Sequence, residues 1–157
     1  MGIKERKELE KQEMRKLILD TAMKLFLEKG FENVTIRNIA ENIEYSPATI
    51  YLYFKDKDEI LYTLHYEGFE ELYRRQVEIL TIRDPLKRLH KHAEMYVSFA
   101  LENPEYYDLM FIKTAPFKKI KEMKHNNGMN WEIGMRSYDF LKNNIEECMR
   151  EGFFQNT

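Results

Sequence analysis

Residues 46–57, with the sequence SPATIYLYFKDK, combine side chains of the kinds that contact double-stranded DNA. Four small residues come first, and they can approach the edges of bases without bulk: Ser46, Pro47, Ala48 and Thr49. Four residues with hydroxyl or ammonium groups suited to phosphate follow: Tyr51, Tyr53, Lys55 and Lys57. The segment therefore predicts a short helix, with its flank, that lies against DNA.

Capping residues on both sides of a tight turn predict two short helices at this place. Thr35 is a good N-cap for a helix over 35–43, and Ser46, followed by proline, starts a second helix over 47–53. Three isoleucines supply an apolar seam between them: Ile39, Ile43 and Ile50. Ala40 is small where the helices would cross. These are the dimensions of a helix-turn-helix, whose second helix enters a major groove about 12 Å wide.

The rest of the chain also reads as helical. Apolar residues at three- and four-residue steps, with capping residues before proline, predict helices over 6–29, 57–80, 85–102, 104–113, 117–124 and 130–151. Gly30 ends the first helix, and a turn is expected at 125–128. The predicted fold class is all-α. It divides into a three-helix helix-turn-helix part over 1–56 and a helical part over 57–157.

Composition excludes several other classes of protein. The 157 residues are 43% hydrophobic and 33% charged, and no run approaches the roughly 18 apolar residues of a membrane span. The first residues lack the apolar run of a secretory signal, and the single cysteine cannot form an internal disulfide. We therefore expect a cytoplasmic protein without a membrane partner. The net charge of −2 does not indicate nucleic-acid binding, so DNA contact depends on where a few charges lie.

Three segments together resemble the DNA-binding domain of the TetR family of repressors: FLEKGFENVTI at 26–36, IA at 39–40, and SPATIYLYFKDK at 46–57. The resemblance is continuous from about 18 to 61. It implies a DNA-binding domain over 1–56 and a helical ligand-binding and dimerisation domain over 57–157. It implies that Thr35 is a phosphate-binding N-cap and that Arg37 reaches a base or a phosphate. It also implies that Tyr51 contacts the DNA backbone, that Tyr53 lies at the groove, and that Lys57 binds phosphate at the start of a long helix.

Glu44 departs from this pattern, because the family usually has glycine at that place in the turn. If the position requires a positive φ, a residue other than glycine costs on the order of 1 kcal/mol. The carboxylate would also lie near the DNA backbone, where it lowers affinity.

Aromatic and methionine side chains in the second half could line an apolar pocket with a few hydroxyls. The candidate ligand-binding residues are Tyr62, Tyr66, Phe69, Tyr96, Phe99, Met110, Trp131 and Tyr138. Ordinary core packing is the alternative for each of them. His90 and His92 are two residues apart, and side chains at that spacing lie on different faces of a helix, so no metal site is predicted. No cofactor is predicted, and the phosphate-loop, nucleophile and zinc-protease motifs of enzymes are absent.

Taken together, these features predict a ligand-responsive transcriptional regulator rather than an enzyme. It would be a repressor that binds a palindromic operator as a homodimer and is released by a small apolar or aromatic molecule. The alternative is an all-α small-molecule-binding or interaction module that no longer binds DNA. The resemblance also implies further helices after Gly152, the last pair of which builds the dimer interface. We expect either a shortened member or a chain that continues beyond Thr157.

Overall fold

The computed structural model describes residues 2–127 and 132–154, and those residues form helices and no strand. The predicted all-α fold class is confirmed. Within the described residues there are eight α-helices: α1 (Ile3–Lys29), α2 (Ile36–Asn42), α3 (Pro47–Tyr51), α4 (Lys57–Glu78), α5 (Pro85–Glu102), α6 (Pro104–Tyr107), α7 (Thr114–Asn127) and α8 (Glu132–Arg150). None of the described helices is long and apolar enough to cross a membrane.

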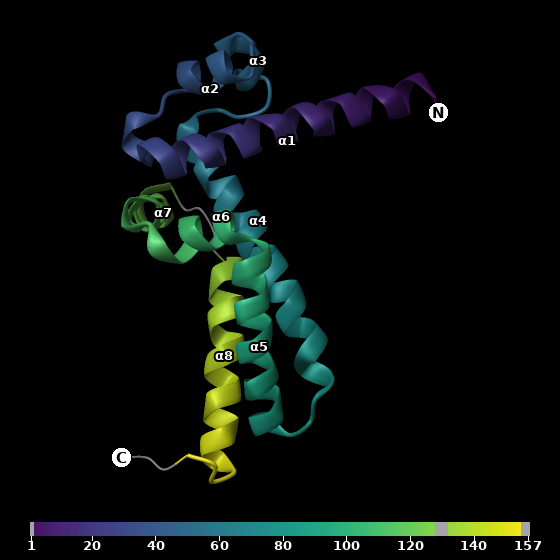
Figure 1. Cartoon of the computed structure of the whole chain (residues 1–157), viewed down its shortest axis with the longest axis vertical. Coiled ribbons are helices and arrows are strands. Elements are labelled where there is room, and N and C mark those ends of the chain that lie inside the picture. Colours follow the sequence, from purple (N-terminus) through teal and green to yellow (C-terminus); the bar gives the residue numbers. More distant parts are fainter. Residues whose placement is uncertain (1, 128–131, 155–157) are drawn as a thin grey trace.

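The helices are arranged in two parts, a first part formed by α1, α2 and α3 and a second part formed by α4, α5 and α8 (Figure 1). The helix α1 lies across one end, with its first turns projecting from the molecule and with α2 and α3 packed beside its second half. Below it, α4, α5 and α8 run side by side along the long axis, and α6 and α7 lie between the two parts. The helix α4 begins next to the α1–α3 part and ends far from it, so it joins the two.

Side-chain caps start the helices where the sequence predicts them. Oγ of Ser46 accepts from the amide of Thr49 at 3.4 Å, and proline occupies the first turn of α3, where no amide donor is needed. The Asp56 carboxylate caps α4 by accepting from the amide of Glu59 at 2.8 Å. Gly30 closes α1 with a φ of 82°, a backbone conformation that side chains disfavour.

Each of the two parts has its own hydrophobic core. The first is built from α1, α2, α3 and the beginning of α4, and residues of α7 and the segment after α6 close it: Leu109, Ile120 and Met123. The second lies between α4, α5 and α8 and contains Phe69, Leu72, Met95, Phe99, Met110 and Ile133. Tyr106 packs against both cores, so the two parts are in contact through α6.

The structure corrects two local predictions. The predicted helix over 117–124 is the longer α7, whose first turn tolerates Pro116 because its amide would have no partner there, and residues 125–127 are helical rather than a turn. Gly128 lies outside the described residues. The predicted helix over 104–113 changes after α6 into a π-helical turn, Asp108–Ile112, in which the amide of Lys113 donates to the Asp108 carbonyl at 2.9 Å.

Candidate DNA interface and ligand cavity

The helix α2 is fixed by a reciprocal cap and by an apolar seam against α3. The amide of Asn38 donates to Oγ1 of Thr35 at 3.1 Å, while Oδ1 of Asn38 accepts from the amide of Thr35 at 2.9 Å. Four residues are buried where the two helices meet: Ile39, Ala40, Ile43 and Ile50. The apolar seam predicted from the sequence is therefore present, and through it the short α3 packs closely against α2, which supports it.

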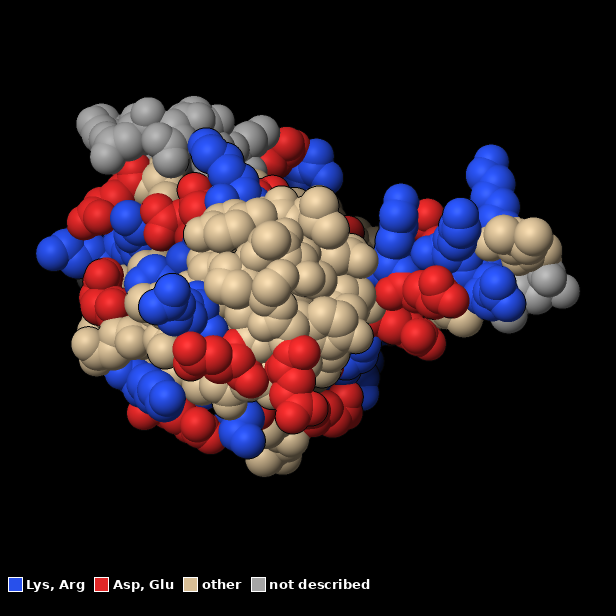
Figure 2. Space-filling view, turned by 90° about the horizontal axis from the view of Figure 1, so that it is seen from above, with Lys and Arg blue, Asp and Glu red and all other residues tan. Residues whose placement is uncertain are grey.

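The predicted DNA-contacting residues lie at one end of the molecule. Six of them are exposed: Thr35, Arg37, Ser46, Ala48, Tyr51 and Lys55. The other four are half-buried: Pro47, Thr49, Tyr53 and Lys57. Tyr51 is 56% exposed at the end of α3. Seen from this end, the middle of the face is uncharged, and acidic and basic side chains surround it (Figure 2).

Lys57 differs from the other basic residues of this end because its ammonium already has contacts. Nζ donates to the Phe31 carbonyl at 2.8 Å and lies 4.3 Å from the centre of the Phe31 ring. Burial lowers the pKa of Lys57, although Glu32 and Asp58 oppose that shift. The contact ties the start of α4 to the turn that follows α1, a role that the sequence did not predict.

The turn between α2 and α3 has the conformation that the glycine of the resemblance suggests. Glu44 has a φ of 59°, and it is the one residue other than glycine with positive φ among those described. The next amide, of Tyr45, donates to the Ala40 carbonyl at 3.0 Å. The side chain of Glu44 is exposed beside α3, so the turn forms normally at a cost in backbone energy.

A cavity of about 710 Å³ lies in the second part, between α4, α5, α8 and the π-helical turn. This is within the roughly 300–1,000 Å³ range of small-molecule sites. Four residues predicted to bind a ligand line it: Phe69, Tyr96, Met110 and Tyr138. The π-helical turn supplies Met110 and Phe111, and Gly68 allows the close approach because an added Cβ would collide with Sδ of Met110.

The remaining predicted ligand residues do not line this cavity. Tyr62 and Tyr66 lie in a separate shallow hollow near Arg15. Phe99 is fully buried in the second core, with the guanidinium of Arg75 5.6 Å from its ring centre. Trp131 lies outside the described residues. The aromatic positions predicted from helical spacing are thus divided between the cavity, the core and another surface.

Three polar residues of the cavity wall were not among the predicted ligand-binding residues: Gln76, His92 and Ser137. Nε2 of Gln76 lies 2.9 Å from Nε2 of His92 and 3.2 Å from the Ser137 carbonyl oxygen, and all three residues are buried. Burial lowers the pKa of His92, so its imidazole is neutral near pH 7. Each of these polar side chains interrupts the apolar face of its helix, which is a signal that the sequence contains. The sequence does not show that the three meet, because that depends on how α4, α5 and α8 pack together.

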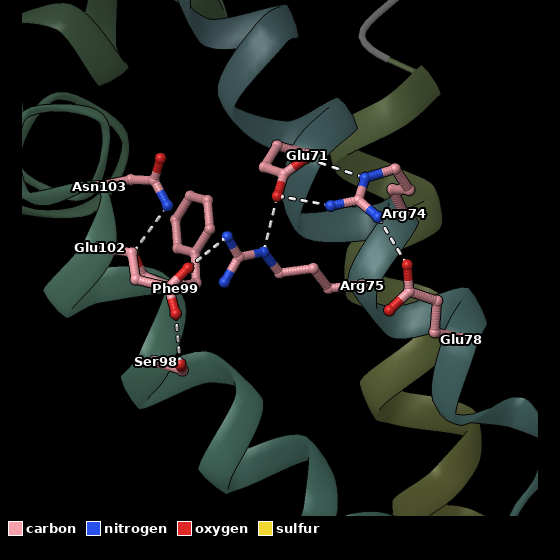
Figure 3. Close-up of polar contacts among 8 residues, drawn as sticks. All are labelled: Glu71, Arg74, Arg75, Glu78, Ser98, Phe99, Glu102 and Asn103. Atoms are coloured by element: carbon pink, nitrogen blue, oxygen red, sulfur yellow. Dashed lines mark hydrogen bonds and ion pairs between the residues drawn. The ribbon is translucent and has the colours of Figure 1, made fainter.

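Ion pairs hold α4 and α5 together in a hollow separate from the cavity (Figure 3). Arg75 donates to Glu71 at 2.7 Å and to Glu102 of α5 at 2.7 Å. Arg74 pairs with Glu71 and with Glu78. Together these contacts keep the charged side chains of α4 paired outside the cavity and fix the position of its inner face.

The fold and these two sites define a class of protein: an all-α helix-turn-helix protein with a cavity in its helical second half. Comparison with known proteins gives the family. Residues 18–63 match the model of the bacterial regulatory proteins of the tetR family. This stretch of the chain is thus similar to the DNA-binding domain of the TetR family.

Individual relatives agree with this assignment. The HTH-type transcriptional regulator HbdR of Aromatoleum sp. (strain CIB) is 29% identical over 147 residues, which are 92% of this chain and 61% of HbdR. A putative TetR-family transcriptional regulator from Syntrophomonas wolfei str. Goettingen has a crystal structure that is similar with a TM-score of 0.68 at 26% identity, covering 94% of this chain and 74% of that one. Both relatives are named as transcriptional regulators, which is the class of protein that the sequence predicts.

A more distant neighbour shows a likeness of fold alone. AibR, solved in complex with isovaleryl coenzyme A and operator DNA, has a TM-score of 0.64 at 17% identity, covering 91% of this chain and 76% of AibR. The chain spans between 34% and 61% of the length of three curated relatives that it matches.

Proposed function

We propose that this chain is a transcriptional repressor that binds operator DNA through α3. The observation that carries the proposal is the short, exposed α3 held against the capped and buried α2, within the segment that matches the TetR family. Small side chains at the start of α3 leave room for base edges in a major groove. We assign DNA binding to residues 1–56, and effector binding and dimerisation to residues 57–157.

Particular contacts follow from the placement of the side chains. The exposed hydroxyl of Tyr51 and the ammonium of Lys55 contact phosphate beside the groove, while Ser46 and Ala48 lie over the bases. Thr35 and Arg37 contact the backbone from the beginning of α2. Lys57 has a carbonyl partner, yet an ammonium has three protons, so it also reaches phosphate at the N-terminus of α4.

Two copies of the chain act together on a palindromic operator. A helix-turn-helix dimer places its recognition helices about one helical turn of DNA apart, which matches a two-fold symmetric site. A dimer seated on a promoter represses by occupying the DNA, and this requires no contact with another protein.

The cavity binds the effector, a small apolar or aromatic molecule. The helix α4 connects the two sites, because Ile60, Leu61 and Leu64 pack in the first core and Phe69 lines the cavity. A ligand that shifts α4 therefore moves α3, and DNA binding and ligand binding weaken each other equally. AibR, a protein of this fold, was solved in complex with isovaleryl coenzyme A and operator DNA, so this fold can bind both a small molecule and DNA.

The test is a fluorescence-anisotropy titration with duplex DNA from upstream of the chain's own gene, with random duplex as control. We expect the specific site to bind on the order of 10³-fold more tightly than random DNA. The logarithm of affinity should fall with the logarithm of salt concentration by roughly 0.9 for each phosphate contacted.

Two tyrosines provide matched variants for this experiment. Tyr51→Ala should weaken binding about tenfold or more, whereas Tyr66→Ala, at an exposed tyrosine of the other part, should not change it. Equal, weak binding of both duplexes by a chain shown to be dimeric would contradict the proposal. That result would favour an effector-binding module without DNA affinity.

A further inference from the structure

We propose that the cavity between α4, α5 and α8 takes an uncharged, mainly apolar ligand that donates a hydrogen bond to Oε1 of Gln76, namely a phenol or an alcohol. The proposal rests on the proposed effector site and names the chemical class of its ligand. It is carried by a buried acceptor that the protein leaves unpaired at the cavity wall.

The Ser137 carbonyl fixes the orientation of the Gln76 amide. A carbonyl oxygen can only accept, so the atom of Gln76 that lies 3.2 Å from it must be the nitrogen. The second proton of that nitrogen is directed at Nε2 of His92, 2.9 Å away, which accepts it and leaves the proton of the neutral imidazole on Nδ1. Both donors of the amide are thereby used.

Oε1 of Gln76 is left without a partner. Its exposed surface is below 1 Å², the whole residue is 2% exposed, and no described atom donates to it. Gln76 is one of the residues that line the cavity, and a buried acceptor without a hydrogen bond is costly, so a ligand whose donor reaches this oxygen gains affinity by pairing it. An ether or a hydrocarbon of the same shape cannot make this gain.

The rest of the wall excludes charge. None of the described residues that line the cavity is Asp, Glu, Lys or Arg. The hydroxyl of Tyr96 is hydrogen-bonded to Tyr107, and the imidazole of His92 is neutral. The nearby arginines of α4 are paired with carboxylates in a separate hollow (Figure 3). A carboxylate ligand would lose its hydration without a cation to replace it, and it would face the oxygen of Gln76.

Aromatic walls favour a flat body for the ligand. The rings of Phe69 and Phe111 meet edge to face with centres 5.6 Å apart, and Tyr96 lies 5.7 Å from Phe111. Such walls pack well against an aromatic ring. The naphthalene skeleton is therefore a suitable probe, because one hydroxyl can be exchanged while the body stays the same.

The experiment compares three probes with the full chain at pH 7: 2-naphthol, 2-methoxynaphthalene and 2-naphthoate. We expect 2-naphthol to bind about 10- to 100-fold more tightly than the methyl ether, and 2-naphthoate to bind least. Similar affinity for naphthol and ether, or tighter binding of naphthoate, would overturn the ligand class while leaving a ligand site in place. Failure of all three probes to bind up to their solubility would contradict the effector site itself.

Two variants assign the preference to the glutamine. Gln76→Leu removes the acceptor, so the affinity ratio of naphthol to ether should fall to about twofold or less. Leu141→Met changes an apolar residue of the same wall, and the ratio should stay as in the unmodified chain. A role of Gln76 in structure alone would change the affinity for both probes equally and leave their ratio intact, which would overturn the proposal.

Discussion

The two parts of the molecule are stabilised by different kinds of interior. Around α1, α2 and α3 the buried side chains are apolar, from Ile18 and Phe26 to Ile50. The buried polar side chains of the described residues all belong to the second part: His65, Gln76, Arg88, His92, Ser137 and Asn144.

This difference fits two tasks. An apolar, close-packed core gives a rigid support, which a helix that must enter a DNA groove needs. Buried polar groups cost free energy unless they are paired, so their presence in the second part calls for a reason. Arg88 and Asn144 pair within the protein, whereas Gln76 and His65 keep unpaired atoms. The second part is thus less optimised for stability and more open to a ligand.

Shortening one buried isoleucine to alanine in each part gives the largest expected change in the free energy of unfolding. Ile50 of α3 is 0% exposed in the first core, and Ile133 is 8% exposed in the second core. Ile50→Ala should lower the free energy of unfolding by about 2–5 kcal/mol, and Ile133→Ala by about 1 kcal/mol less, because its neighbours can relax towards the cavity. Urea unfolding measures both values.

DNA binding sharpens this comparison at temperatures where both variants are folded. Ile50→Ala should weaken binding because α3 loses its support, while Ile133→Ala should leave it unchanged. A larger loss of stability for Ile133→Ala would show that the second core is the rigid one.

His65 makes the stability of the second part depend on pH. Burial lowers the pKa of His65 from 6.5 to about 4, and both ring nitrogens are unpaired. Below pH 6.5 the unfolded chain takes up a proton that the folded chain refuses, so stability falls as the pH drops from 6.5 to 4. The loss through this group amounts to about 3 kcal/mol.

Unfolding measured between pH 4 and 7 tests this dependence. His65→Phe keeps a ring stacked on Phe69 and should make the profile less steep over this range, leaving the smaller dependence due to the buried His92, while His90→Phe, at an imidazole that is 81% exposed, should not change the slope. Parallel profiles for His65→Phe and the unmodified chain would show that the folded chain protonates this imidazole as readily as the unfolded chain does, which contradicts the prediction.

In contrast to His65 and Gln76, the buried Arg88 has hydrogen-bond partners within the protein. Nη1 donates to the Ile82 carbonyl at 2.8 Å, Nε donates to Oδ1 of Asn144 at 3.2 Å, and the guanidinium pairs with Glu147. Arg88→Leu leaves buried acceptors without partners and should lower the free energy of unfolding by about 2 kcal/mol. Arg136→Leu, which breaks an exposed pair with Glu132, should cost less than about 0.5 kcal/mol. Equal losses would mean that burial adds nothing to the Arg88 contacts.

The two parts also differ in how well their structure can be predicted from the sequence. The helix-turn-helix depends on local features, such as the Thr35 and Ser46 caps, and on a segment with a recognisable family pattern, so its helices were placed nearly residue by residue. The cavity depends on the packing of α4, α5 and α8 and on a π-helical turn that no spacing indicates. Hence Phe69 and Tyr96, two of the predicted ligand-binding residues, line the cavity, while Tyr66 and Phe99 lie elsewhere and Gln76 is not among the predicted residues.

Glu44 gives the smallest expected effect and tests whether the rigid part is fully optimised. Its φ of 59° costs on the order of 1 kcal/mol, but glycine also loosens the unfolded chain, so Glu44→Gly should stabilise the fold by about 0.5 kcal/mol. Removing the exposed carboxylate should also strengthen DNA binding, more at low salt than at high salt. Glu44→Gln separates the two causes, because glutamine lacks the charge but keeps a side chain that disfavours this conformation. Equal gains in affinity for both variants would assign the effect to charge, whereas a gain for glycine alone would assign it to the geometry of the turn.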